Sequence, residues 1–215
     1  MPLSTFYNLD PSKQEKIINA TIKEFAKYGY KNTTISSIAK KAKVSKGSIY
    51  QYFKNKEKLY IYIFDKSYRD KKRHIKNAIY IYEIEDFFSL LEALFMEAYL
   101  FSLKNPDLQK IYFDLMKNTN QKLKNKILNR YKTDLENDNY NYLKYLKQEM
   151  NKKKIKNDID KKLAAFIVSS FLENFSLILI EKDILTNTIE IQNYIQNFIK
   201  VLKNGIEKKN NRKEC

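Results

Sequence analysis

The chain has 215 residues, 43% of them hydrophobic, which is enough to bury a core in one domain or in two small ones. Its single cysteine, Cys215, excludes an intrachain disulfide framework or thiolate metal cluster and suits a reducing cytosol. The N-terminus has no basic region followed by an apolar run, and the most apolar stretch, 163–180, is interrupted by polar residues. We therefore expect a cytoplasmic protein that is neither exported nor inserted into a membrane.

The formal net charge of +16 is concentrated towards the N-terminus. Residues 1–60 hold twelve lysines and only four acidic residues. Two explanations compete: an anionic partner such as nucleic acid, or the excess of Lys, Asn, Ile and Tyr that an AT-rich genome encodes. The uneven distribution favours an electrostatic surface for DNA.

Apolar residues recur three and four positions apart, and the chain contains only three Gly and three Pro, so we expect an all-helical protein. The first helix begins with Asp10 as its N-cap and Pro11 at its first position. Gly29 is expected to end it as a left-handed C-cap. Further helices are predicted over 56–80, 85–104, 107–118, 121–153, 159–182 and 188–208.

Residues 33–53 have the pattern of a helix-turn-helix. Thr34 is expected to cap a short helix through Ala42, and Ser45 to cap a second one through about Phe53. Two helices that cross near a right angle need a small residue at the crossing, here Ala39, and apolar residues on both sides of the turn: Ile35, Ile38, Val44 and Ile49. A helical hairpin whose lysines are simply solvated also fits this spacing.

The caps of these two helices predict phosphate sites, because free backbone N–H groups lie beside Thr34 and Ser45. Gly47 and Ser48 keep the front of the second helix small. The backbone of this helix could then approach the floor of a DNA major groove.

The run from Thr33 to Leu59 resembles the signature of the tetracycline-repressor (TetR/AcrR) family of bacterial regulators. The matching pieces are Thr34, Ile38-Ala39, Ala42, the segment 44–50, Tyr52-Phe53 and the segment 54–59; residues 17–29 resemble the family's first helix. The close resemblance covers about residues 13–64. One departure is Lys43, at a position in the turn where the family usually has glycine. The turn is expected to need a positive φ there, which costs a non-glycine residue about 1 kcal/mol.

The resemblance implies an all-α fold with two domains. Residues 1–55 would form an N-terminal three-helix helix-turn-helix DNA-binding domain, and residues 56–215 a C-terminal helical bundle for ligand binding and dimerisation. The implied function is a DNA-binding transcriptional regulator: a ligand-responsive repressor that binds an inverted-repeat, double-stranded operator as a homodimer.

The resemblance also implies residue roles in DNA binding. Phosphate contacts would come from Thr34, Tyr50 and Lys56, with Ser45 as the second helix cap. Base-edge contacts would come from the exposed front of the second short helix: Lys46, Gly47, Ser48, Gln51 and Tyr52. Gln51 has the amide that pairs with adenine, and Lys46 could donate to guanine or to phosphate. Phe53 is expected in the core.

Two apolar-faced helices close the chain and, by the same resemblance, would form a four-helix dimer interface with their symmetry mates. The candidate interface residues are Phe171, Phe175, Ile195 and Phe198. An ordinary intramolecular core would show the same pattern.

The helices between 85 and 131 are rich in aromatic residues, and members of this family commonly hold a small molecule there. Candidate ligand contacts for a small hydrophobic or cationic effector are Phe95, Tyr99, Phe113 and Phe171, although such stripes are also typical of plain core. Four acids could select a cation if they face inwards, but we expect them to be solvated: Glu92, Glu97, Asp114 and Glu173.

An enzyme is not expected. The lone His74 lies in a basic stretch, is expected to be exposed, and has no cysteine or second histidine with which to bind a metal. The three glycines are too far apart to form a phosphate-binding loop. We therefore assign no catalytic residue, metal or cofactor. The alternative to a regulator is a constitutive, weakly specific DNA-binding protein without a small-molecule switch.

Overall fold

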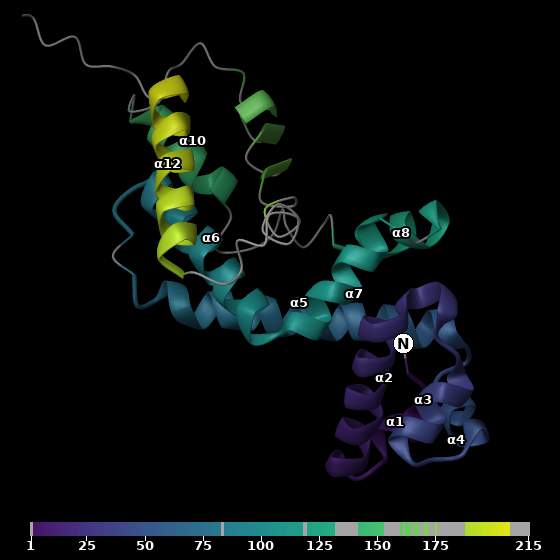
Figure 1. Cartoon of the computed structure of the whole chain (residues 1–215). Coiled ribbons are helices and arrows are strands. Elements are labelled where there is room, and N and C mark those ends of the chain that lie inside the picture. The colour runs from purple at the N-terminus through teal and green to yellow at the C-terminus, as the bar shows by residue number, and fades with distance from the viewer. Residues whose placement is uncertain are drawn as a thin grey trace, which may run out of the picture. The chain divides into compact units, whose positions relative to one another are not determined.

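The computed structural model describes residues 2–82, 84–117, 120–131, 142–152 and 188–206, together with residues 160, 162–164, 166–167, 170–171 and 175. The described secondary structure is helical throughout, which confirms the all-α prediction (Figure 1). The chain folds into two compact units: an N-terminal unit of Met1–Arg73 with Lys104–Asp134, and a C-terminal unit of His74–Leu103 with Leu135–Cys215.

The N-terminal unit contains the helix-turn-helix and the helices that support it. Its elements are α1 (Ser4–Tyr7), α2 (Pro11–Asn32), α3 (Ile35–Ala42), α4 (Lys46–Tyr52), most of α5 (Lys56–Ile79), α7 (Pro106–Lys117) and α8 (Gln121–Leu128). Helix α2 packs against both α3 and α7. The predicted apolar face of α2 is buried, with Ile17 and Phe25 almost completely inaccessible. This unit extends beyond residue 55 because α5, α7 and α8 share its core.

Gly29 breaks α2, but not in the way that the sequence suggested. Its φ of 71° is positive as expected, whereas its ψ of 173° is extended rather than left-handed helical, and the helix resumes as far as Asn32. The N–H of Tyr30 donates to Asp114 Oδ2 at 2.8 Å. A Cβ at Gly29 would lie 2.7 Å from Asp114 Oδ1. Asp114 on α7 thus satisfies the backbone at the break, so the prediction of a solvated acid is wrong here.

The long helix predicted over 121–153 is also wrong. Helix α8 ends at Leu128 and a turn follows at 129–131, while α10 (Tyr142–Asn151) is a separate helix. The turn is held by Asp65, whose carboxylate accepts from Arg130 Nε (3.1 Å) and Nη2 (2.8 Å) and from the Tyr131 hydroxyl (2.8 Å). Burial, together with the hydrogen bond to Asp65, raises the pKa of Tyr131.

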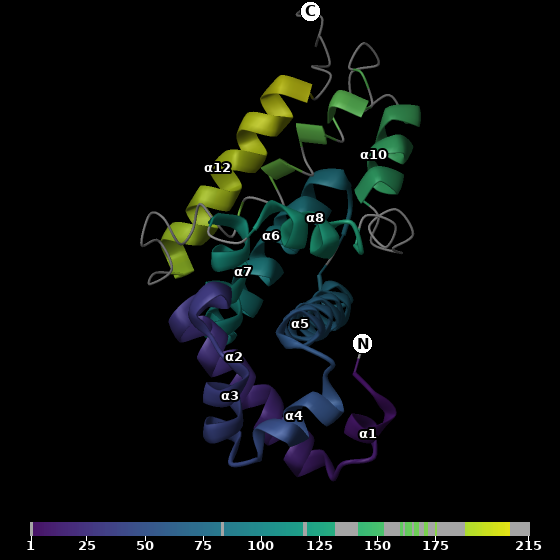
Figure 2. The ribbon, with the colours of Figure 1, turned by 90° about the vertical axis from the view of Figure 1, so that its right-hand side faces the viewer.

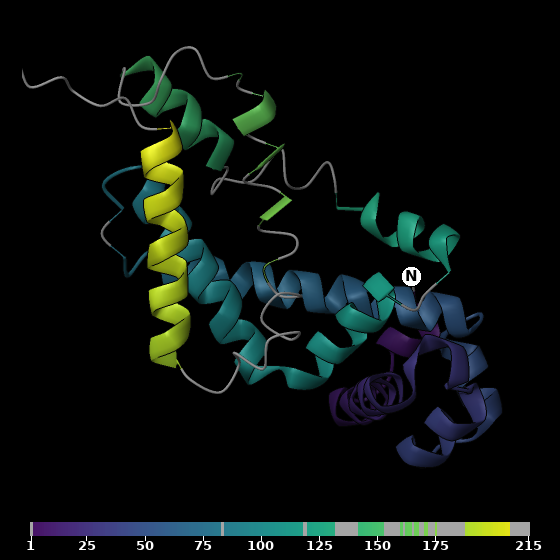
Figure 3. The ribbon, with the colours of Figure 1, turned by 45° about the horizontal axis from the view of Figure 1, so that its top comes forward.

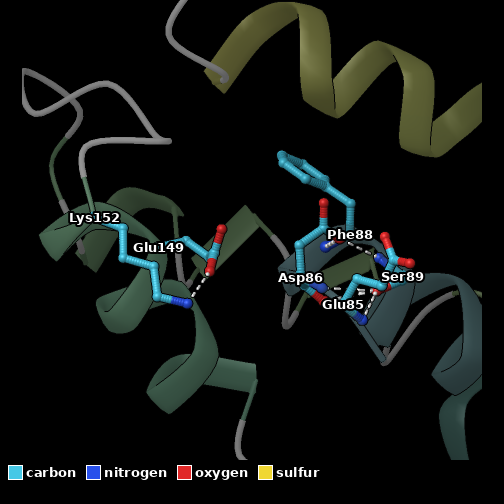
Figure 4. Close-up of polar contacts among 6 residues, drawn as sticks. All are labelled: Glu85, Asp86, Phe88, Ser89, Glu149 and Lys152. Carbon is cyan, nitrogen blue, oxygen red and sulfur yellow. Dashed lines mark hydrogen bonds and ion pairs between the residues drawn. The ribbon is translucent and has the colours of Figure 1, made fainter. Parts of the chain in front are cut away.

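The C-terminal unit has a core built from α6 (Phe87–Lys104), α10 and α12 (Thr188–Ile206), with helical residues between 162 and 175 (Figure 3). Helix α6 begins two residues later than the predicted start at 85. Asp86 Oδ1 accepts the N–H groups of Phe88 (2.9 Å) and Ser89 (2.8 Å), and Ser89 Oγ accepts the Asp86 N–H (3.0 Å) (Figure 4). This reciprocal cap fixes the start of α6. Just after the end of α10, Lys152 Nζ lies 3.2 Å from Oε1 of Glu149 on that helix (Figure 4).

Some sequence predictions fall on residues that the structure does not describe. They include Glu173, the end of the predicted 159–182 helix beyond 175, and the tail after Ile206 that contains Cys215. Within the described ranges, no helix combines the length and the apolar composition that a membrane span requires.

Candidate DNA-binding surface

Helix α3 begins with a capping box. Thr34 Oγ1 accepts a hydrogen bond from the Ser37 N–H at 3.0 Å, and Ser37 Oγ in turn accepts one from the Thr34 N–H at 3.4 Å. The helix buries Ile35, Ile38 and Ala39 against the core, so its opposite face is exposed. These residues match the predicted apolar positions, and the start at Ile35 agrees with Thr34 as the cap.

The turn between α3 and α4 depends on Lys43, which adopts a left-handed conformation (φ 56°, ψ 43°). The Val44 N–H donates to Ala39 O at 3.0 Å, the six-residue bond of a Schellman motif. The predicted positive φ at Lys43 is therefore present. Its cost of about 1 kcal/mol is offset by the bonds that close the turn.

Helix α4 presents the candidate recognition face. Ser45 caps it, with Oγ accepting the Ser48 N–H at 3.0 Å, and Ile49 faces the core. A Cβ at Gly47 would meet nothing nearer than Ser45 Oγ at 3.7 Å, so the fold itself does not require glycine there. Gly47 is the second residue of α4, and without a side chain it keeps the front of this helix small.

Most of the predicted DNA contacts lie on the exposed surface around α3 and α4. Exposed residues are Thr34, Ser45, Lys46, Gly47, Tyr50 and Gln51, with Ser48 half-buried. The predicted base-edge contact from Tyr52 does not fit the structure. Only 6% of this residue is exposed, and its ring centroid lies 6.0 Å from that of Phe6. Tyr52 is therefore a core residue and does not belong to the exposed front. Phe53 is fully buried, as predicted.

Lys56 has an unexpected environment. Its ammonium donates to the carbonyl oxygens of Tyr30 (2.8 Å), Thr33 (2.9 Å) and Lys31 (3.3 Å) and lies 4.5 Å from the centroid of the Tyr30 ring. Burial lowers the pKa of Lys56. In this arrangement Lys56 holds the end of α2 against the start of α5, so the predicted phosphate contact would have to compete with these carbonyl groups.

Sequence reasoning missed α1, which closes the back of α4. The Leu3 N–H donates to Tyr52 O at 2.9 Å, and the Thr5 hydroxyl donates to Gln51 O. Phe6 is fully buried, with its ring centroid 4.9 Å from that of Phe53. A four-residue helix is too short to show a periodic pattern, and the apolar Leu3 and Phe6 were its only signal in the sequence.

The candidate dimer residues lie mainly inside the C-terminal unit. Phe175 and Ile195 are each 1% exposed, so the intramolecular alternative holds for these two. The half-buried rings of Phe171 and Phe198 are stacked, with their centroids 3.4 Å apart and an angle of 7° between their planes. Large apolar side chains are exposed elsewhere on the same two segments: Leu163, Phe166, Ile167, Ile189 and Val201.

The candidate ligand residues are divided between the two units. Phe95 on α6 is fully buried, and its ring centroid lies 5.2 Å from that of Phe171. Tyr99 is buried on the same helix, α6. Phe113 belongs to the N-terminal unit, where Lys117 Nζ lies 4.8 Å from its ring centroid.

Two sequence predictions about polar residues of the C-terminal unit are wrong. Glu97 is 5% exposed and accepts the Tyr82 hydroxyl at 2.6 Å, and His74 Nε2 lies 2.8 Å from its other oxygen. Burial, followed by the bond to Glu97, raises the pKa of Tyr82 to about 12. His74 was expected to be exposed, but only 24% of its side chain is. The described residues contain no group of three potential metal ligands.

Known proteins share this helix-turn-helix. The sequence model of the family described as "Bacterial regulatory proteins, tetR family" matches residues 17–63. The uncharacterized HTH-type transcriptional regulator YhgD of Bacillus subtilis is 40% identical over 67 residues, which cover 31% of this chain and 35% of YhgD. The helix-turn-helix segment is therefore that of the TetR family, which confirms the resemblance found in the sequence over these residues. The chain spans about a third of the length of YhgD, and the relatives that match it are named as transcriptional regulators rather than enzymes, in line with the expectation.

Solved structures of transcriptional regulators have the same fold. A TetR-family regulator from Chloroflexus aurantiacus J-10-FL superposes with a TM-score of 0.72 at 22% identity, covering 97% of this chain and 100% of the other. FadR from Bacillus subtilis, solved in complex with stearoyl-CoA, gives 0.66 at 22% identity and covers 86% and 96%. At this identity the likeness shows the fold, including the C-terminal helices.

Proposed function

We propose that this protein binds an operator in double-stranded DNA through α4, as a cytoplasmic transcriptional regulator. The observation that carries the proposal is the exposed face of α4, where Lys46, Gly47 and Gln51 lie beside the Ser45 cap with no structural need for the glycine. A small, polar front is what a helix needs to enter a major groove and reach base edges. In this proposal residues 1–55 bind DNA, and residues 56–215 form the domain for ligand binding and dimerisation.

Residue roles follow from exposure. Gln51 and Lys46 would contact base edges, with Ser48 beside them, while Thr34, Ser45 and Tyr50 would bind phosphate. Tyr50 is 45% exposed and directly precedes Gln51. A contact between the Tyr50 hydroxyl and a phosphate would therefore help to position the side-chain amide of Gln51.

The roles of Tyr50 and Gln51 can be separated. Tyr50→Ala should weaken binding to operator and to scrambled DNA by the same factor, because phosphate contacts carry no sequence information. Gln51→Ala should cost about 1–3 kcal/mol at one base pair and relax the preference there. Tyr28→Ala is the matched control, since Tyr28 is also 45% exposed but lies on α2. Fluorescence anisotropy with operator duplexes substituted at each position measures both effects; unchanged affinity for both variants contradicts the assignment.

We also propose that the active species is a homodimer that binds an inverted repeat. The exposed apolar residues Leu163, Phe166 and Ile167 recur three and four positions apart on one helical face, as expected of a helix with a partner. A two-fold dimer would place two copies of α4 one helical turn of DNA apart, about 34 Å.

An apolar small molecule that binds in the C-terminal unit is proposed as the effector, with repression as the outcome of DNA binding. Support comes from the aromatic cluster of Phe95, Phe171 and Phe198, and from FadR, a protein of similar fold that was solved with stearoyl-CoA. A differential affinity of about 1–3 kcal/mol between two conformations would change DNA affinity by about 5- to 150-fold.

The effector proposal predicts that one class of compound dissociates the DNA complex. The test titrates a labelled operator complex with long-chain acyl-CoA, free fatty acids and apolar cations, with coenzyme A as the control that lacks an acyl chain. A response to an acylated compound or an apolar cation, but not to coenzyme A, is expected. DNA affinity that stays constant across the panel would favour the constitutive DNA-binding alternative.

A further inference from the structure

A basic groove runs along the N-terminal unit beside the recognition helix. It has a volume of about 710 Å³ and lies between α2 and the turn that joins α3 to α4. Five lysines line it, against one acid, Asp10: Lys13, Lys16, Lys23, Lys41 and Lys43. None of the residue roles assigned above uses the three lysines of α2.

The α2 lysines form a row rather than a scatter. Lys13, Lys16, Ala20 and Lys23 follow one another at spacings of three, four and three residues, which places them on one face of the helix. Ala20 keeps the middle of this row small, and from Lys13 to Lys23 the row is about 15 Å long.

The charges of the groove are not all available to a ligand. Lys41 Nζ lies 3.0 Å from Glu24 Oε1 in an ion pair. Burial of Glu24 would raise its pKa, but hydrogen bonds from Lys41 and Ser37 outweigh that effect and lower it, so the Glu24 carboxylate stays ionised beside Lys41. Asp10 is used as the N-cap of α2, accepting the Ser12 N–H at 2.8 Å. The remaining lysines, Lys13, Lys16, Lys23 and Lys43, are exposed.

One end of the groove adjoins the recognition helix. Lys43 and Val44 line the groove and immediately precede Ser45, the cap of α4. In Figures 1 and 2 the first turn of α2 and the connection between α3 and α4 lie at the same end of this unit. Lys13 and Lys16 lie near that end of α2, whereas Lys23 lies two to three turns further along the helix.

We propose that the phosphate backbone flanking the base pairs read by α4 passes over this end of the groove and is bound by Lys13, Lys16 and Lys43. This inference rests on the proposed function and extends the DNA-binding surface from the helix-turn-helix to the first turns of α2. DNA is the occupant that the geometry favours, because a duplex on α4 brings a row of phosphates past Lys43. Lysine binds phosphate as a point charge without base preference, so these contacts add affinity but no sequence specificity.

The test compares Lys13→Gln/Lys16→Gln with Lys23→Gln/Lys27→Gln, a control double variant that removes the same charge from exposed positions further along α2. Affinity for operator DNA is measured from 50 to 300 mM salt, and a thermal melt establishes that each variant is folded. Each lost phosphate contact reduces the slope of log K against log salt by about 0.9. For Lys13→Gln/Lys16→Gln we expect the magnitude of this slope to fall by about 1.8, and for the control double variant we expect little change in the slope. The ratio of the affinity for operator DNA to the affinity for scrambled DNA should stay unchanged in both.

Each other result overturns the inference. Equal loss of slope in both double variants would mean that only net charge matters. An unchanged slope in Lys13→Gln/Lys16→Gln would exclude DNA from the groove; if that variant also lost binding of tripolyphosphate, the groove would be a small-anion site. These results leave the proposed function intact, because the wild-type protein would still prefer its operator. A wild-type protein without that preference would refute both.

Discussion

Gly29→Ala should destabilise the N-terminal unit by about 3 kcal/mol. The combination of φ 71° and ψ 173° lies in a region essentially restricted to glycine, and occupying such a region costs other residues about 1–3 kcal/mol. The new Cβ would also lie 2.7 Å from Asp114 Oδ1, so the carboxylate must move and weaken its bond to the Tyr30 N–H. The free energy of unfolding, obtained from urea denaturation followed by circular dichroism, measures the loss.

Gly205→Ala is the matched control for this substitution. A Cβ at Gly205 would meet no neighbouring group within 4 Å, and the residue is the second-last of α12. The gain of about 0.5–1 kcal/mol from alanine over glycine applies to a helix interior, so at this end position the variant should be about as stable as the wild type. If Gly29→Ala were as stable as the wild type, the close fit between α2 and α7 described above would be wrong.

If the protein forms the proposed dimer, Phe166→Asp should convert it to a folded monomer and lower operator affinity at least about 100-fold. Phe166 is 66% exposed within the chain, so a carboxylate there should leave the fold intact while placing two like charges in an apolar dimer interface. A dimer binds its second half-site at high effective concentration, which typically increases overall affinity by about 10²–10⁴. A monomer loses that gain.

Sedimentation velocity at micromolar concentration and anisotropy with an operator duplex measure the two effects. Ile81→Asp serves as the control, because Ile81 is 85% exposed but lies outside the proposed interface. A Phe166→Asp protein that sediments as a dimer would place the interface elsewhere. A wild-type monomer would contradict the dimer proposal altogether.

The helix-turn-helix was predictable because its constraints are local. The caps at Thr34 and Ser45, the small Ala39 at the helix crossing and the apolar positions on either side of the turn are all visible within twenty residues, and the structure has each of them as expected. Tyr52 was misplaced because its neighbour in space, Phe6, lies 46 positions away in a helix with no sequence pattern.

The polar interior was harder to predict for the same reason. Asp114, Glu97 and His74 are charged or polar residues on amphipathic helices, where a solvated side chain is the usual outcome. Their partners, Tyr30, Tyr82 and one another, come from other elements and become apparent only in three dimensions. The same holds for Phe175 and Ile195, because an apolar stripe looks identical whether it faces its own chain or a second copy.

The most direct test of the central claim is a titration of the wild-type protein against a duplex from its own upstream region and against a scrambled duplex of the same composition, at 150 mM salt. A regulator that reads bases through α4 should prefer its operator by at least about a thousandfold. Equal affinity for the two duplexes, with the steep salt dependence that the +16 charge would give, would contradict the claim and indicate a protein that binds DNA through charge alone.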